Sequence, residues 1–348
     1  MKPCLRIIGL MLLAILIVSC DIKDLVSPDL TYKAYYCRYD AQRNKTLLLR
    51  PEDGILSYSD SQIHRTKDGK VLIYRDYFWK GEPDFTGFYP ISGYIPTNYT
   101  THIPYFSEDG RYLWFAMSGS IYRFDLNNSS YEKITSDLGF AVHSPRLTAD
   151  GNYLVMIRSL SGTINPGYPV VMNLNDSTLV HLDNAEPTAT QAVYIPKFGT
   201  VYYVRYNETN YYQGEGALYS ISINNAFNQA LVPIVWYYNL NLYLSNDERF
   251  IVTHKPPQGF LENGHLLVRD NSSMLWSEIC GTGQAALART ANVLYYTKDT
   301  SIYRWDLETG TRERIISDTF KGKKIKGFYS LSPSWDGTDL IFTAELGD

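Results

Sequence analysis

Apolar and polar positions alternate in short runs along most of this chain, the pattern of β-strands that bury one face. No stretch sustains the 3.6-residue period of a helix. Polar turns containing Gly, Asp or Asn separate the runs. The 30 tyrosines agree with this pattern, because aromatic residues are enriched in strands. The pattern therefore predicts an all-β chain built from short strands.

One turn recurs at a regular period. The segments TKDGKVLIYRD, SEDGRYLWFAM and TADGNYLVMIR begin at Thr66, Ser107 and Thr148, and their glycines are 41 residues apart. Asp-Gly between apolar runs is a strong hairpin signal, because the tight turn requires a positive φ. Weaker copies follow at Gly199, at Asp247, near Asn292 and at Gly337. Copies spaced by roughly 40–50 residues are typical of the four-stranded blades of a propeller.

Each copy has a second half, and the two ends of the chain complement each other. GSIYRFDLNNSSYEKIT (119–135) and TSIYRWDLETGTRERII (300–316) share an aromatic strand, Asp-Leu, a polar turn and a last strand. The last copy has only its first half, and KAYYCRYDAQRNKTLLLR (33–50) has the form of the missing half. We therefore predict a seven-bladed β-propeller, closed by pairing the N-terminal and C-terminal strands in one blade. Six blades, eight blades or an open β-sandwich are the alternatives.

Two of these copies carry a family resemblance. SPSWDGTDLIFTA (332–344) and YFSEDGRYLWFAM (105–117), the latter followed by IYRFDL (121–126), resemble the WD-repeat-like units of the TolB type. The resemblance covers most of residues 60–348 and implies the propeller fold. It implies little about function, because one fold hosts many activities.

The first residues form a different segment. Lys2 and Arg6 flank an apolar run at residues 7–18, which is shorter than the roughly 20 residues that span a bilayer but long enough for a signal peptide. The run ends in IVSC, which resembles the lipobox of bacterial lipoproteins. That family implies cleavage before Cys20 and acyl chains, such as palmitate, on this residue. An uncleaved anchor, or an ordinary signal with a chance cysteine, is the alternative.

This resemblance divides the chain and places it in the cell. We expect a signal peptide at residues 1–19, a short tether at 20–30 and the propeller domain at 31–348. The protein would lie in the bacterial cell envelope, anchored to a membrane through its N-terminal lipid. Asp21 does not decide between the inner and the outer membrane.

Charge and cysteine content narrow the picture further. The formal net charge is -4, and a mildly acidic chain without a basic run is a poor candidate for binding nucleic acid. Cys37 and Cys280 would remain after removal of the signal and lipidation of Cys20. They stand in different blades, so buried free thiols are expected rather than a disulfide.

Motifs for chemistry are sparse. The chain has no Gly-x-Ser-x-Gly elbow, His-Glu-x-x-His, Cys-x-x-Cys or phosphate-binding glycine loop. The glycine-rich CGTGQAA (280–286) is interpreted as a turn between blades. The sequence therefore predicts no catalytic residue, no metal and no cofactor.

Two histidines share one position of the repeat. His102 and His143 each stand seven residues before the turn aspartate, in a segment that would lie at or before the innermost strand. Such a pair could bind a metal ion or an anionic ligand. The preceding copy has Ser61 at this position, with His64 three residues further on. A histidine bonded to a neighbouring loop is the alternative.

A long aromatic segment is the second candidate binding site. Residues 74–99 are interrupted by Gly and Pro and are rich in Tyr, Phe and Trp. An insertion on one propeller face would make a binding loop, because exposed aromatic rings anchor interfaces and stack on sugars. The ligand-binding candidates are Trp79, Phe85, Phe88, Tyr89 and Tyr94. Packing of these rings between blades is the alternative.

Three functions follow, in order of preference. The first is a non-catalytic scaffold that binds a protein partner in the cell envelope. The second is a module that binds glycan or peptide through residues 74–99. The third is a small enzyme with its site at the channel, using His102 or His143; the absence of a convergent acid–base or metal set argues against it.

Overall fold

The structure is a computed structural model, and it describes residues 34–49, 62–74, 78–84, 86–91, 105–107, 109–135, 138–159, 167–183, 185, 188–206, 215–224, 229–235, 241–255, 264–320 and 322–346. The chain divides into two units, residues 1–34 and 35–348, and the described strands lie in the second, apart from Ala34 at the start of the first strand. Strands, turns and one short 3-10 segment, η2 (Pro196–Phe198), make up the described residues. The all-β prediction is therefore confirmed. None of the described helical segments is long and apolar enough to cross a membrane.

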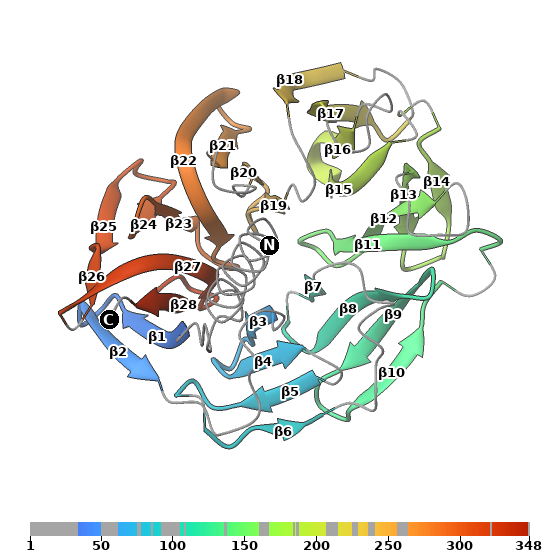
Figure 1. The fold of residues 1–348 in the computed structure, drawn as a ribbon. Coiled ribbons are helices and arrows are strands. Elements are labelled where there is room, and N and C mark those ends of the chain that lie inside the picture. The colour runs from blue at the N-terminus through green and yellow to red at the C-terminus, as the bar shows by residue number, and fades with distance from the viewer. Residues whose placement is uncertain are drawn as a thin grey trace, which may run out of the picture. The chain divides into compact units, whose positions relative to one another are not determined.

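Two sheets are simple four-stranded antiparallel meanders (Figure 1). The first consists of β3 (Gln62–Arg65), β4 (Val71–Tyr74), β5 (Phe78–Gly81) and β6 (Tyr89–Pro90). The second consists of β7 (Tyr105–Phe106), β8 (Tyr112–Met117), β9 (Ser120–Asp125) and β10 (Ser130–Lys133). Each strand pairs with its neighbour in sequence, as the four-strand repeat predicts.

A larger sheet consists of two such meanders that meet at one residue pair, Gly167 with Ala189. The first meander contains β11 (Val142–Leu147), β12 (Tyr153–Ser159), β13 (Gly167–Asn173) and β14 (Leu179–His181). The second contains β15 (Ala189–Ile195), β16 (Thr200–Tyr206), β17 (Glu215–Ser222) and β18 (Gln229–Val235). A single cross-pair leaves the four-strand grouping of the repeat intact.

The next sheet is joined by one long strand. Its members are β19 (Asn241–Leu244), β20 (Phe250–Lys255), β21 (Gly264–Asp270), β22 (Leu275–Leu287), β23 (Val293–Lys298), β24 (Ser301–Asp306) and β25 (Arg312–Ile316). The first part of β22 pairs with β21 and its last part pairs with β23. The predicted turn at residues 280–286 is therefore wrong. Gly281 has a φ of 78°, which absorbs an extra residue as a bulge within the strand instead of ending it.

The last sheet joins both ends of the described chain. Its order is β2 (Lys45–Leu49), β1 (Ala34–Asp40), β28 (Asp339–Leu346), β27 (Lys323–Pro333) and β26 (Thr319–Phe320). Figure 1 shows β1, in blue, beside β28, in red. The N–H of Ala41 donates to the carbonyl of Thr338 at 2.9 Å beside this junction. The N-terminal strands therefore complete this sheet, because β1 pairs with the edge of β28 that the C-terminal strands leave unpaired.

The repeated turn has one local structure. Gly69, Gly110, Gly151 and Gly337 all have positive φ, and each donates its N–H to the carbonyl of the residue three positions earlier. That residue is Ser or Thr, and its hydroxyl donates to the turn aspartate. The aspartates accordingly act as turn formers, as predicted, because their carboxylates bind hydroxyl and backbone N–H groups inside the turn.

The apolar core lies between successive four-strand groups. One cluster packs Ile195 and Val204 of β15 and β16 against Leu242 and Ile251 of β19 and β20. Alternating apolar positions put one side-chain set on each face of a sheet, so every group buries both faces. Each large apolar side chain buried in this way contributes about 1.5–3 kcal/mol to stability.

The two cysteines of the described chain differ in their surroundings. Cys37 of β1 is fully buried in the core, whereas Cys280 of β22 is exposed, and both are free thiols. The expectation of buried free thiols therefore holds for Cys37 and is wrong for Cys280, because the outward face of β22 carries Cys280 into solvent.

Candidate functional site

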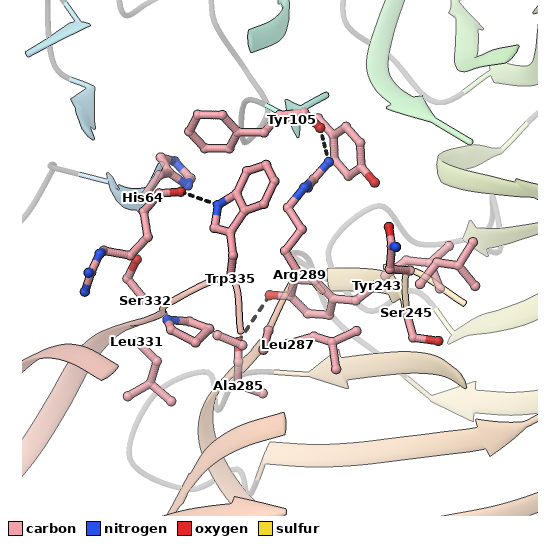
Figure 2. A pocket seen from close by; sticks show the side chains of 18 of the residues that line it. His64, Tyr105, Tyr243, Ser245, Ala285, Leu287, Arg289, Leu331, Ser332 and Trp335 are labelled. Atoms are coloured by element: carbon pink, nitrogen blue, oxygen red, sulfur yellow. Dashed lines mark hydrogen bonds between the residues drawn. The ribbon is translucent and has the colours of Figure 1, made fainter. Parts of the chain in front are cut away.

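The innermost strands of several sheets surround a cavity of about 330 Å³ (Figure 2). Residues of β3, β7, β11, β15, β19, β22 and β27 contribute to its lining. One repeat position supplies much of it: the residue two positions before the Ser or Thr that begins the turn. The lining residues at this position are His64, Tyr105, Arg146, Tyr243 and Ser332. The repeat thus brings distant parts of the sequence to a single site.

Arg289 places a positive charge in the cavity. It follows the end of β22, and its guanidinium donates to the main-chain oxygen of Phe106. The guanidinium carbon lies 4.1 Å from the ring centroid of Tyr105 and 5.2 Å from that of Trp335, so it is held between two aromatic rings (Figure 2). Trp335 is itself fixed by a 2.8 Å hydrogen bond from its indole N–H to the carbonyl of Arg65. The cation is therefore positioned by rings and backbone.

Arg146 places a second positive charge beside the first. A bulge between His143 and Arg146, with Ser144 at a φ of 54°, interrupts the register of β11 before Arg146. The Arg146 guanidinium lies 5.1 Å from the ring centroid of Tyr105. Burial lowers its pKa, the charge of Arg289 lowers it further, and Tyr105 and Tyr243 raise it. Among the described residues, no hydrogen-bond acceptor pairs with this guanidinium.

His64 completes the group. Burial lowers the pKa of this imidazole to about 4, and the charges of Arg146 and Arg289 act in the same direction. Its Nε2 atom is buried without a hydrogen-bond partner in the part of the chain that the structure describes. The ring also makes an edge contact with Phe106, 6.0 Å between centroids. His64 is therefore neutral at neutral pH, with a buried nitrogen that a ligand could satisfy.

The remaining described lining is aliphatic, aromatic and polar. Burial raises the pKa of Tyr243 to about 12, and its hydroxyl donates to the carbonyl of Ala285 at 3.2 Å. The lining also includes Ser245, Asn246 and Gln284. Among the lining residues that the structure describes, none is Asp or Glu. Arg65 also lines the cavity, but it is neutralised by a 2.7 Å ion pair with Asp339.

We call this site the arginine cavity, defined by His64, Tyr105, Arg146, Tyr243 and Arg289. Two cations, with no carboxylate among the described lining residues, form a site of net positive potential in a partly desolvated space, where electrostatic interactions are strong. Its described lining holds one imidazole and no carboxylate or thiol, so it lacks the donor set of a zinc or manganese site.

The structure places the predicted histidines differently. His143 is 3% exposed, and its Nδ1 lies 2.9 Å from the hydroxyl oxygen of Ser144, which donates to the carbonyl of Thr190. It does not line the arginine cavity. His102 lies outside the described residues. The histidine that the cavity does contain is His64.

The described part of the aromatic segment belongs to a sheet. Phe78 and Trp79 are in β5, and Tyr89 is in β6. Phe78 is fully buried, and Trp79 and Phe88 pack against the cluster around Ile73, whereas Tyr89 is 53% exposed. Phe85 and Tyr94, like Cys20, lie outside the described residues. Of the described candidates in this segment, Tyr89 is the one that solvent reaches freely.

Arg146 and Arg289 are the site residues that the sequence analysis missed. Arg146 lies three residues after His143, within the HSPRLTADG segment already aligned. Comparing the position two before the turn across copies would have singled it out, together with His64, Tyr105 and Tyr243. Arg289 belongs to a diverged copy without Asp-Gly, where the alignment carries no such signal.

No protein-family model and no curated protein matches this chain. Among solved structures, an oligogalacturonate lyase from Vibrio parahaemolyticus is 11% identical, with a TM-score of 0.54 over 90% of this chain and 97% of that protein. An oligogalacturonate lyase in complex with manganese is 11% identical, with a TM-score of 0.52 over 91% and 92%. A putative TolB from Agrobacterium tumefaciens is 12% identical, with a TM-score of 0.49 over 90% and 98%. The two lyases show that this chain has the β-propeller fold.

Proposed function

We propose that this protein is a β-propeller binding module whose arginine cavity takes a small anionic ligand, a sugar that carries a carboxylate. One observation carries the proposal: Arg146 and Arg289 share a cavity to which the described residues contribute no carboxylate. Two like charges that are buried without a counter-ion repel each other and lose their hydration. An anion bound in the cavity would supply the counter-ion, so its binding would be favourable. The cavity volume lies at the lower end of the range for small-molecule pockets.

The chemistry of the lining favours a carboxylate. A guanidinium offers paired N–H donors that match the two oxygens of a carboxylate, and such charge-assisted bonds are stronger than neutral ones. Arg146 has its donors available, and Arg289 is held in place by Phe106 and two rings. His64 lies close enough to Arg146 and Arg289 for their charges to lower its pKa, and its imidazole can form a further hydrogen bond to the ligand.

The rest of the lining favours a sugar. Tyr105, Tyr243 and Trp335 provide aromatic rings (Figure 2), and Gln284 provides an amide group. Aromatic faces with a few polar groups are suited to a ring that bears hydroxyls. Oligogalacturonate, named in two of the structural neighbours, is a sugar of this charge class, although those neighbours share only the fold.

We propose binding without catalysis. The described lining offers a neutral histidine and two arginines but no carboxylate base and no metal donor set. An arrangement of cations and rings can hold an anion, and its one imidazole, His64, is a weak base because its pKa is lowered to about 4.

We further propose that the blades number seven and close a ring. Seven core clusters join the four-strand groups in a cycle. In chain order they link the terminal sheet to β3–β6, then β7–β10, β11–β14, β15–β18, β19–β22, β22–β25 and the terminal sheet again. In the part of the chain that the structure describes, this cycle gives every group a neighbour on both apolar faces, which supports closure.

The location of the module remains a proposal from the sequence. Acylation of Cys20 after removal of residues 1–19 would anchor the propeller to a membrane of the bacterial cell envelope. A Cys20→Ala variant should then lose incorporation of labelled palmitate in cells and leave the membrane fraction. Retention of label by this variant would exclude acylation at Cys20.

A protein partner in the envelope stays a second proposal. The exposed large apolar side chains of the described residues include Leu47, Tyr89, Tyr131 and Phe198, which stand on different strands or turns. Tyr89 belongs to the aromatic segment 74–99 and lies on β6, the edge strand of its sheet. If the protein is a scaffold, as the sequence analysis predicts, we propose that the partner protein binds at this edge.

Isothermal titration with digalacturonate and with its neutral counterpart galactobiose tests the main proposal. We expect saturable binding of the acidic disaccharide, weakened by salt, and at least tenfold weaker binding of the neutral one, about 1.4 kcal/mol or more. Equal affinity for both sugars, or no binding of digalacturonate, would contradict an anionic-sugar site.

A further inference from the structure

A second group of reactive side chains lies outside the arginine cavity, on β21 and β22. His265 is on β21, and Glu278 and Cys280 are on β22. His265 stands directly opposite Cys280 in the antiparallel register, and Glu278 is two residues from Cys280 on the same strand. Side chains opposite each other, and two apart, point to the same face of a sheet. The side chains of all three residues therefore project from the same face of the sheet.

The donor atoms are already close. The Nδ1 of His265 lies 3.1 Å from a carboxylate oxygen of Glu278, and that oxygen lies 3.6 Å from the Sγ of Cys280. One donor atom from each residue falls within 4.8 Å of the others. Zinc bonds of about 2.0–2.3 Å in a tetrahedron place the ligand atoms about 3.3–3.7 Å apart. Two of the three separations thus need little or no adjustment.

The backbone holds this geometry. The pairing of β21 with β22 shifts between Gly264 and His265, where Gly281 enters the strand with a φ of 78°. Most residues avoid this conformation, so Gly281 places the bulge directly after Cys280. The regular ladder through Glu278 and Cys280 ends there, with both side chains on the same face as His265.

The donor chemistry selects the metal. Thiolate and imidazole are soft or borderline ligands that prefer zinc over calcium or magnesium, and a carboxylate is a common third ligand. A divalent cation between Glu278 and Cys280 would bind the thiolate, with release of a proton, and would offset the repulsion between thiolate and carboxylate.

We propose that His265, Glu278 and Cys280 form a zinc site on the exposed face of β21 and β22, with the remaining coordination position open to solvent. Glu278 and Cys280 are exposed and His265 is partly so, so the ion and a water ligand can reach the site. Three protein ligands with an open position is the arrangement of zinc sites that keep a water. The site does not overlap the arginine cavity and does not depend on what that cavity binds.

Cobalt spectroscopy tests the proposal, because Co²⁺ replaces zinc and reports its ligands. The full-length protein, purified without a histidine tag, is titrated with Co²⁺ and then with Zn²⁺. We expect a thiolate-to-cobalt charge-transfer band and the visible bands of tetrahedral cobalt, saturating near one ion per chain, with Zn²⁺ displacing the cobalt.

Matched variants assign the ligands. Cys280→Ser should abolish the charge-transfer band, and His265→Gln and Glu278→Gln should each weaken cobalt affinity at least about tenfold. Glu132→Gln, which alters an exposed strand carboxylate elsewhere, should leave the spectrum unchanged. Urea unfolding confirms that each variant is folded. The proposal is overturned if the wild-type chain shows no thiolate band, or if the band survives in Cys280→Ser.

Discussion

Arg289 donates a hydrogen bond to the main-chain oxygen of Phe106, a residue 183 positions earlier in the chain. The contact joins the turn after β22 to the short strand β7, which belong to different sheets. It holds a cation in place without a carboxylate, so the charge stays available to a ligand. The fold thus preorganises the positive side of the arginine cavity before anything binds.

Binding at the arginine cavity should strengthen as the pH falls. Burial lowers the pKa of His64 to about 4, helped by the charges of Arg146 and Arg289. A bound anion offsets those charges and raises the pKa of the imidazole, so binding takes up protons and tightens as pH falls from about 7 toward 5. Titration calorimetry with digalacturonate across this range, in buffers of different ionisation enthalpy, measures both effects. The His64→Gln variant should bind with no such proton uptake; an identical pH profile would refute the role of His64.

Two buried histidines should make the fold sensitive to acid. Burial lowers the folded-state pKa of both His64 and His254 from 6.5 to about 4. Between these values the unfolded chain binds the protons, so stability is full above about pH 6.5 and declines as pH falls toward 4, by about 3 kcal/mol per histidine. Urea unfolding at pH 7 and pH 5 measures the loss. His254→Leu should flatten the curve; an unchanged slope would show that His254 does not titrate in this way.

The ion pair between Arg65 and Asp339 should be a strong support of the terminal sheet. Asp339 of β28 accepts from Arg65 at 2.7 Å and also from Arg38 of β1, and both Arg65 and Asp339 are buried. Asp339→Asn leaves a buried arginine uncompensated, which costs about 3–5 kcal/mol. The matched control is Asp183→Asn, which removes an exposed ion pair with Arg158 and should cost less than about 1 kcal/mol. Urea unfolding compares the free energies of unfolding of the two variants. Equal losses of stability would show that the buried ion pair contributes no more than the exposed one.

Two glycines separate backbone strain from crowding. Gly337 and Gly310 have φ values of 67° and 73°, so alanine is strained at both. A Cβ at Gly337 would lie 2.9 Å from the Cβ of Val293, whereas one at Gly310 would meet nothing within 4 Å. Gly337→Ala should therefore destabilise the protein by about 1–3 kcal/mol more than Gly310→Ala. Thermal unfolding of both variants measures the difference, and similar losses would contradict tight packing at the repeated turn.

Much of the fold could be predicted from the sequence, because the repeated turn depends on local chemistry. The Asp-Gly pairs at Gly69, Gly110 and Gly151 require a positive φ, and the structure has it. Gly281 could not be interpreted in the same way. A glycine with positive φ serves a turn or a bulge equally well, and only the pairing of β22 with β21 and β23 decides between them.

The site was harder to predict than the fold. His143 and His102 attracted attention as a repeated pair, but the bulge at Ser144 changes which residues of β11 face the cavity. Arg146 holds the repeat position that lines the cavity, two residues before Thr148, and comparing the copies at that position would have identified it. Arg289 meets Tyr105 only through the packing of separate sheets, which no local pattern records.

The central claim is that Arg146 and Arg289 bind the anion, and calorimetry on matched variants tests it most directly. Digalacturonate is titrated into the wild-type protein and into Arg146→Gln, Arg289→Gln and Arg43→Gln, the last being a control whose side chain is 81% exposed. We predict that each cavity variant weakens binding by about tenfold or more, since a charge-assisted hydrogen bond contributes about 1.5–3 kcal/mol, and that the control binds as the wild type does. Equal affinities across all four proteins would contradict the account.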